Sequence, residues 1–225
     1  LKRVVVTGMG AITPLGNTIE DYWTGLINGV SGADMITQFD ASKFRTKFAC
    51  EVKNFEPTQF LHKKEARKID RFTQFALVVS DQAMTDAGLN KENINPDRIG
   101  VVFASGIGGL TTFQHEVTDF AKGDGTPRFN PFFIPKMILD IAAGQISMRH
   151  NLRGPNFAVV SACASSTNAI MDAFNLIRLG KADIILTGGS EAVISEAGVG
   201  GFNAMKAMSE RNDDPKTASR PYDKD

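Results

Sequence analysis

The residue best suited to chemistry is Cys163, which lies between a short apolar run and a helical pattern. Residues 157–161 are apolar and largely β-branched, which is typical of a buried strand. From residue 167 to 179, apolar residues recur at helical spacing. A thiol in the turn between them would lie at a helix N-terminus, where free N–H groups and the helix dipole stabilise a thiolate. The pattern therefore predicts a cysteine nucleophile.

Two other interpretations of Cys163 stay open on the residues alone. Free cysteine is among the most buried residue types, so Cys163 could be a small core residue. It could also serve a cysteine hydrolase, but S-A-C-A-S lacks the G-x-[SC]-x-G turn, and no histidine is placed as the base. The strand, the turn of small residues and the helix together favour the nucleophile.

Glycine-rich turns follow two more predicted strands. The strand that ends at Ala104 leads into S-G-I-G-G at 105–109, and the strand that ends at Thr187 leads into G-G-S-E at 188–191. Strands that alternate with helices predict a doubly wound, mostly parallel sheet. Ligands in such sheets bind beyond the carboxyl ends of the strands. We therefore expect one site to gather Cys163 and these two turns.

The other elements follow from periodicity and from helix-end signals. A first strand is expected at 4–6, and helices are expected over 19–28, 63–87, 110–122 and 135–149. The first two turns of the helix at 63–87 would carry four basic residues: Lys63, Lys64, Arg67 and Lys68. Positive charge at a helix N-terminus opposes the dipole, which indicates an anionic partner. Residues 195–209 either line an apolar pocket or pack as an ordinary loop.

Composition and motifs exclude several classes of function. Basic and acidic residues number 25 each, which gives no reason to expect nucleic acid or a membrane surface as partner. Two cysteines cannot form a disulfide framework, which points to a reducing cytoplasm. The histidines lie far apart in the sequence, so no metal site is expected. The turn at 8–16 begins like a dinucleotide-binding loop, but a threonine replaces its third glycine, and we expect a packing turn.

The chain as a whole resembles the β-ketoacyl-acyl carrier protein synthases of fatty-acid elongation, of the synthase II type. The matching motifs run from end to end: V-V-V-T-G-M-G-A-I-T-P-L-G, R-K-I-D-R-F, S-G-I-G-G-L, N-P-F-F-I-P-K, L-R-G-P-N, S-A-C-A-S-S, T-G-G-S-E, G-V-G-G-F and A-S-R-P-Y-D-K-D. Family members are nearly twice as long. We therefore expect both ends of this chain to be cut, with residues 1–225 as the N-terminal half of the enzyme and the C-terminal half absent.

The resemblance implies the thiolase-like α/β fold, in which two similar halves pack together and the enzyme forms a homodimer. This half would hold a mostly parallel mixed sheet covered by helices. Cys163 matches the nucleophile that takes an acyl group from an acyl carrier protein. Malonyl-carrier protein would then lose CO2, and the carbanion would attack the acyl-enzyme to give a 3-oxoacyl chain two carbons longer. The resemblance implies no cofactor and no metal.

The resemblance also implies roles for other residues. Ile107 matches the residue that gates the acyl pocket, and Phe133 matches one that reaches the pocket of the partner subunit. Ala162 and Phe202 match residues that line the pocket. Five basic residues match the patch that docks the acidic carrier protein: Lys64, Arg67, Lys68, Arg128 and Lys206.

One part of the family's machinery has no match in this chain. Family members decarboxylate with two histidines and a lysine from the second half, and none of His62, His115 and His150 lies in a matching motif. We therefore expect the chain alone not to condense substrates. A half that should pack on another half would expose a large apolar face, which predicts poor solubility or tight self-association of the isolated chain. Two alternatives remain: a polyketide ketosynthase, which shares these motifs, and a non-catalytic half that only dimerises or binds carrier protein. Cys163 argues against the second, because non-catalytic relatives usually lack it.

Overall fold

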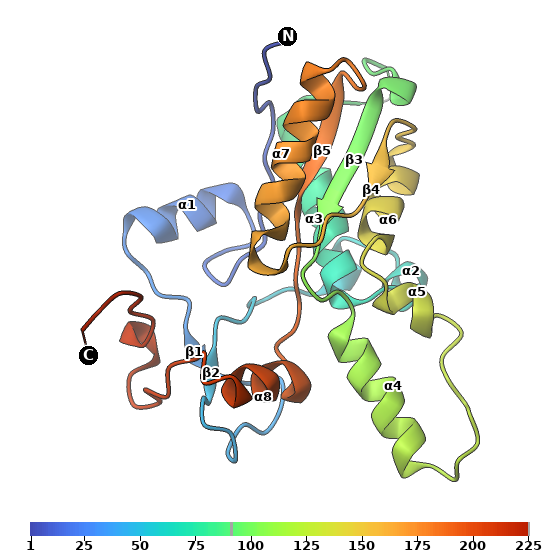
Figure 1. The fold of residues 1–225 in the computed structure, drawn as a ribbon. Helices are drawn as coiled ribbons and strands as arrows, with labels where there is room; N and C mark the ends of the chain where they lie inside the picture. The colour runs from blue at the N-terminus through green and yellow to red at the C-terminus, as the bar shows by residue number, and fades with distance from the viewer. Residues whose placement is uncertain (91, 225) are drawn as a thin grey trace. The chain divides into compact units, whose positions relative to one another are not determined.

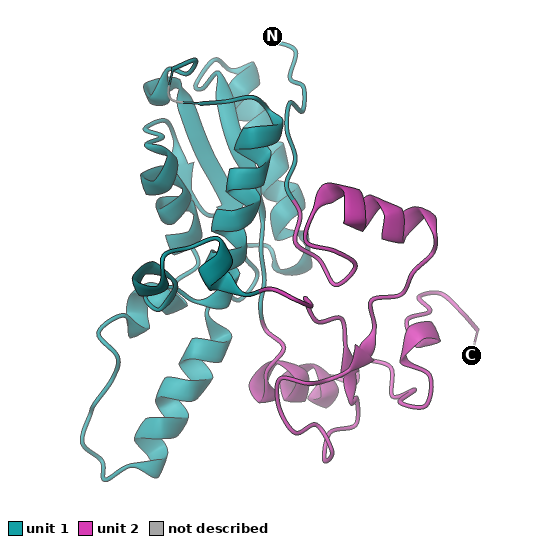
Figure 2. Ribbon diagram, turned by 180° about the vertical axis from the view of Figure 1, so that it is seen from behind, with its two compact units in different colours: residues 1–10, 56–192 teal, residues 11–55, 193–225 magenta. Residues whose placement is uncertain are grey.

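A computed structural model describes residues 1–90 and 92–224, which form two compact units (Figures 1 and 2). Unit 1 comprises Leu1–Gly10 and Glu56–Ala192, and unit 2 comprises Ala11–Phe55 and Val193–Asp225. Asp225, which ends the last of the matching motifs, lies outside the described residues. Within the described part of the chain, no helix is both long enough and apolar enough to cross a membrane.

Unit 1 is built on a parallel sheet with the strand order β4–β3–β5. The central strand β3 (Ile99–Ala104) is buried at every position, as expected for a parallel strand that is covered on both faces. It pairs with β5 (Ile184–Gly189) along its whole length and with β4 (Asn156–Phe157) over two residues. Ala104 lies opposite Gly189, so β3 and β5 end at the same edge of the sheet.

Helices cover both faces of this sheet (Figure 1). Alternate residues of β3 point to opposite faces, as the period of a strand requires. Val101 and Phe103 join the core cluster formed with α3 and α6, whereas Val102 and Ala104 pack with Ala169 of α7. The helices of unit 1 are α2 (Lys63–Ala66), α3 (Arg71–Asp86), α4 (Leu110–Lys122), α5 (Phe133–Met137), α6 (Ile141–His150) and α7 (Ser165–Arg178).

Unit 2 is assembled from segments near both ends of the chain, shown in magenta in Figure 2. The hydroxyl of Thr46 donates to the carbonyl of Ser209 at 2.7 Å and accepts from the side chain of Asn203 at 2.9 Å. These bonds join residues that are more than 150 positions apart in the sequence. The elements of unit 2 are α1 (Ile19–Ile27), the antiparallel pair β1 (Asp34–Met35) and β2 (Phe48–Ala49), and α8 (Glu196–Ala204).

The prediction of one long helix at 63–87 is wrong, because the chain forms two helices there. Asp70 adopts an extended conformation, and its carboxylate caps α3 by accepting the N–H of Phe72 at 3.2 Å. The basic residues therefore lie on the single turn of α2 and on the connection after it, ahead of the N-terminus of the long helix. The predicted conflict between their charge and the dipole of a long helix does not exist.

Three further element predictions need correction. The helix expected at 135–149 is split into α5 and α6, because Ile138 is extended. Residues 4–6 form no strand among the described residues, and Val6 is 81% exposed. The expected buried strand at 157–161 is reduced to β4, which is exposed. The apolar composition of these last two runs indicated burial, but here it produces exposed apolar surface.

Candidate active site

The ends of β3 and β5 bring two glycine-rich turns together within unit 1. Glu191, which follows β5, reaches the loop that follows β3. Its carboxylate accepts the backbone N–H groups of Gly106 at 2.8 Å and Ile107 at 2.9 Å. It also accepts the N–H of Gly108 at 3.3 Å and the hydroxyl of Ser105 at 3.1 Å. One carboxylate thus holds the whole 105–108 segment.

Cys163 is the middle residue of the 3₁₀-helical turn η3 (Ala162–Ala164), which leads directly into α7. Ala162 has a φ of +51°, a left-handed conformation that is unusual for a residue with a side chain. The hydroxyl of Ser165 holds this turn, since it donates to the carbonyl of Ala162 at 2.6 Å and accepts the N–H of Ser161 at 2.8 Å. Cys163 itself is exposed. Its interpretation as a buried core residue is therefore wrong.

Two glycines bring the three turns into contact. A Cβ atom on Gly106 would lie 2.9 Å from Oε2 of Glu191 and 3.4 Å from the carbonyl oxygen of Ala162. A Cβ atom on Gly189 would lie 2.3 Å from Oγ of Ser166, on the first turn of α7. The loop after β3, the turn after β5 and the turn of Cys163 are therefore packed against one another, as the strand ends predict.

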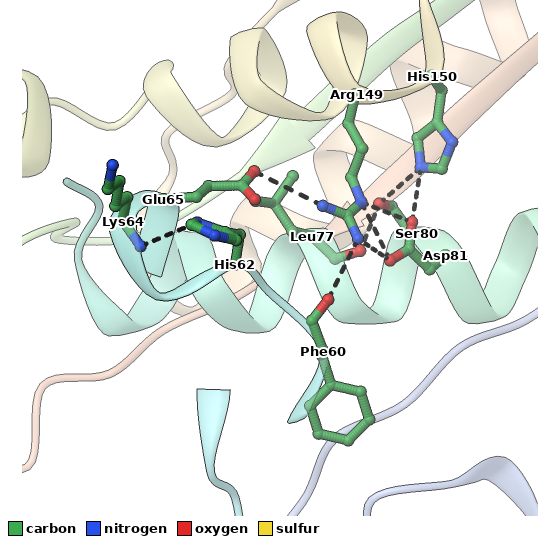
Figure 3. A network of polar contacts seen from close by, with 9 residues as sticks. All are labelled: Phe60, His62, Lys64, Glu65, Leu77, Ser80, Asp81, Arg149 and His150. Atoms are coloured by element: carbon green, nitrogen blue, oxygen red, sulfur yellow. Dashed lines mark hydrogen bonds and ion pairs between the residues drawn. The ribbon is translucent and has the colours of Figure 1, made fainter. Parts of the chain in front are cut away.

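A polar network, shown in Figure 3, ties α2 to α3 and α6. Arg149 donates to the carboxylate of Asp81 through Nε at 2.8 Å and Nη2 at 2.6 Å, and its Nη1 lies 3.6 Å from Glu65 of α2. Nδ1 of His62 accepts the N–H of Lys64 and so caps α2. The cap stabilises α2 itself, and the contact between Glu65 and Arg149 links this short helix to α6 and α3.

His150 belongs to the same network and is not placed to act as a catalytic base. Its Nε2 lies 3.1 Å from Oγ of Ser80 and 3.3 Å from Oδ1 of Asp81. Burial lowers the pKa of His150; the Asp81 carboxylate opposes this shift and the Arg149 guanidinium adds to it. The imidazole is therefore held neutral near pH 7, in a structural setting. Among the described residues, no group of His, Cys, Asp and Glu could hold a metal ion.

Comparison with known proteins decides the family. The family described as "Beta-ketoacyl synthase, N-terminal domain" matches residues 1–225. The chain belongs to the β-ketoacyl synthase family. It is 49% identical, over 224 residues, to the 3-oxoacyl-[acyl-carrier-protein] synthase 2 of Synechocystis sp., and 45% identical, over 221 residues, to that of Staphylococcus aureus. These matches cover 100% and 98% of this chain, but 54% and 53% of the relatives. The chain thus spans about half the length of the curated relatives it matches.

Solved structures show the same fold. A β-ketoacyl synthase from Burkholderia phymatum superposes with a TM-score of 0.87 at 30% identity, over 99% of this chain and 55% of that one. A type II PKS acyl-carrier protein in complex with its ketosynthase bound to the hexaketide gives a TM-score of 0.78 at 22% identity, over 92% of this chain and 55% of that one. The chain therefore has the thiolase-like α/β fold that the sequence predicts.

The family's predicted pocket residues fall in both units. Ile107 is 41% exposed and lies on the loop held by Glu191. Ala162 is the strained residue before Cys163. Phe133 begins α5 and stacks on Phe129, with ring centroids 5.5 Å apart. Phe202 lies on α8 of unit 2, whereas the other three belong to unit 1.

The five residues predicted to dock a carrier protein are all exposed. Lys64 lies on α2, and Arg67 and Lys68 follow it. The ammonium group of Lys68 lies 5.3 Å from the ring centroid of Phe132, a cation–π contact. Arg128 pairs with Asp124 at 3.2 Å. Lys206 belongs to unit 2.

Sequence reasoning missed the hydrogen bonds that Glu191 makes, although it identified the turn that contains this residue. The available signal is an acidic residue placed directly after a glycine-rich strand end, opposite a second glycine-rich loop. Its partners lie more than 80 positions earlier in the sequence. Only the pairing of β3 with β5 brings the two together.

Proposed function

We propose that the chain is the N-terminal half, residues 1–225, of a 3-oxoacyl-acyl carrier protein synthase in which Cys163 carries the acyl chain. The observation that supports this most strongly is an exposed cysteine in a strained turn, packed against two glycine-rich loops. The names of relatives that are 45–49% identical support the same activity. The complementary half would come from sequence outside this chain.

The reaction would proceed in two stages. The Cys163 thiolate attacks the carbonyl carbon of an acyl-carrier protein thioester, and the carrier's thiol leaves. Malonyl-carrier protein then loses CO2, and its carbanion attacks the Cys163 thioester. This attack releases the Cys163 thiolate and a 3-oxoacyl-carrier protein that is two carbons longer. The backbone N–H of Cys163 would supply one donor to the oxyanion, and the second donor and the decarboxylating histidines and lysine would come from the other half.

Substrate and partner follow from the same proposal. Ile107 would gate the acyl pocket, with Ala162, Phe202 and the partner subunit's counterpart of Phe133 lining it in a homodimer. The exposed basic residues would dock an acidic acyl carrier protein: Lys64, Arg67, Lys68, Arg128 and Lys206. A structural neighbour is a ketosynthase in complex with an acyl-carrier protein, which supports this class of partner. A cytoplasmic location, with no nucleic acid or membrane partner, completes the proposal.

A condensation assay on the natural gene product that contains this chain tests the proposal. With acyl- and malonyl-carrier protein, we expect a 3-oxoacyl product. Cys163→Ala should abolish it, while Cys50→Ala, at the other exposed cysteine, should retain it. Product formation by Cys163→Ala at the original rate would overturn the proposal. Residues 1–225 alone should give no product, because the decarboxylating residues would be missing.

The alternative hypothesis, that the chain belongs to a polyketide ketosynthase, is less favoured. The type II PKS neighbour shares 22% identity with this chain, against 45–49% for the relatives named 3-oxoacyl-[acyl-carrier-protein] synthase 2. A preference for simple saturated acyl chains over polyketide chains in the same assay would separate the two activities.

A further inference from the structure

Among the described residues, every hydrogen-bond donor to the carboxylate of Glu191 comes from a single loop, residues 105–108. Its Oε2 accepts the N–H groups of Gly106 at 2.8 Å and Ile107 at 2.9 Å. Its Oε1 accepts the Ser105 hydroxyl at 3.1 Å and the Gly108 N–H at 3.3 Å. Successive backbone N–H groups that converge in this way form an anion-binding concavity, and hydrogen bonds to a charged acceptor are stronger than neutral ones.

The loop is also confined on its other sides. Ser105 is 3% exposed and its hydroxyl accepts the N–H of Gly108 at 3.1 Å. Gly108 has a φ of +76°, and a Cβ atom there would lie 2.8 Å from the carbonyl oxygen of Met137. Gly106 packs closely between Glu191 and Ala162, because a Cβ atom there would lie 2.9 Å from Oε2 of Glu191 and 3.4 Å from the carbonyl oxygen of Ala162. The backbone of the loop is therefore fixed between Glu191 and the turn of Cys163.

The side chain of Ile107, in contrast, is 41% exposed. Its position is consequently set by its backbone more than by packing around the side chain. The direct hold on that backbone is the bond from the N–H of Ile107 to Glu191.

We propose that Glu191 is a positioning residue: it fixes Ile107 at the mouth of the acyl pocket and thereby sets which acyl chains reach Cys163. The inference rests on the proposed function, in which Ile107 gates that pocket. A glutamine at this position would keep one acceptor oxygen but turn an NH2 group towards the N–H groups of the loop. The hydrogen bonds that one of the two carboxylate oxygens accepts would then be lost, and the backbone of Ile107 would no longer be fixed in one position.

The test measures acylation of Cys163 in the natural gene product by intact mass, with carrier protein loaded with hexanoyl or tetradecanoyl chains. We expect Glu191→Gln to change the ratio of the two rates about tenfold or more, because losing even one hydrogen bond to a charged group has an effect of about tenfold. In an Ile107→Ala background, the same substitution should leave the ratio unchanged, since no gating side chain remains to be positioned.

A purely structural role for Glu191 would lower both rates together, in both backgrounds, and that result would overturn the inference. An unchanged ratio for Glu191→Gln would overturn it as well.

If this variant does not fold, Ser105→Ala, which removes one donor to Glu191, must change the ratio, or the inference fails. Absence of acylation in the unsubstituted protein would overturn the proposed function, and this inference with it. Normal acylation with an unchanged ratio would overturn the inference alone.

Discussion

At the scale of single residues, Cys163 owes its presentation to its neighbours. The left-handed Ala162 turns the chain sharply, and Ser165 holds the turn with two hydrogen bonds, so that the thiol is exposed just before α7. Backbone strain of this kind costs about 1–3 kcal/mol and persists only where the surroundings enforce it. Its location beside the proposed nucleophile fits a role in catalysis.

Cys163 should therefore react faster with an alkylating reagent than Cys50. Both thiols are exposed, so the comparison reports nucleophilicity and not access. We expect a difference of about tenfold, because Cys163 lies directly before α7, where the helix dipole favours negative charge on the attacking sulfur in the transition state. Mass spectrometry of iodoacetamide-treated protein measures both rates in one sample. Equal, slow rates would count against an activated thiol.

His150 predicts a pH effect on stability. Burial lowers its pKa in the folded protein, below the value of about 6.5 that an unfolded chain would show. The unfolded state then binds more protons as the pH falls, so stability should decrease from about pH 7 downwards. His150→Gln should flatten this part of the profile, while Asp81 and Arg149 remain in both proteins. Urea unfolding between pH 7 and 5 measures it, and an identical slope in the variant would contradict the assignment.

Single residues also show which parts of the candidate site could be predicted from the sequence. The position of Cys163 in a turn before α7 could be predicted because its signal is local: a run of small residues before a helix. Glu191 could not, because its role depends on the register of β3 with β5, which joins segments far apart in the chain. The same holds for the network of Arg149 and Asp81, whose residues are 68 positions apart.

At the scale of elements, the predictions succeeded where a signal was continuous. The apolar run at 99–104 and the helical pattern at 110–122 became β3 and α4 with the bounds expected. The predictions of long helices at 63–87 and 135–149 were wrong, because local or tertiary hydrogen bonds interrupt both helices. Asp70 caps α3, and the carbonyl of Met137, at the end of α5, accepts the N–H of Gly109. Hydrophobic periodicity carries no information about either bond.

Two glycines should respond in opposite ways to alanine. A Cβ atom on Gly109 would lie 2.3 Å from the carbonyl oxygen of Lys136, so the backbone must shift, and we expect a loss of about 1–3 kcal/mol. Gly144, within α6, has nothing within 4 Å of its Cβ position and serves as the control. Gly144→Ala should stabilise by about 1 kcal/mol through helix propensity. Denaturant unfolding measures both, and an unchanged stability for Gly109→Ala would contradict the packing described.

At the scale of the whole molecule, the main feature is the exposed apolar face of α7. It buries small residues, Ala169 and Ala173, against the sheet and exposes larger apolar ones. Ile170 is 53% exposed, as is Met171. An exposed apolar helix face is the surface expected of one half of a protein that packs against another half.

The isolated chain should therefore self-associate. Sedimentation at increasing concentration should show a rise in mean mass, and Ile170→Glu should weaken it, because a charge on the face opposes its burial. Lys122→Glu, at an exposed position on α4, changes charge without touching this face and should leave association unchanged. Monomeric behaviour of the unsubstituted chain at high concentration would contradict the prediction.

The central claim is that Cys163 carries the acyl chain, and it is tested most directly by mass spectrometry after incubation with fatty acyl-carrier protein alone. We expect the natural gene product to gain the mass of one acyl group per chain, on the peptide that contains Cys163. Cys163→Ser should gain no thioester. An unmodified Cys163 after full exposure to the acyl donor, or an acyl group found only on Cys50, would contradict the account.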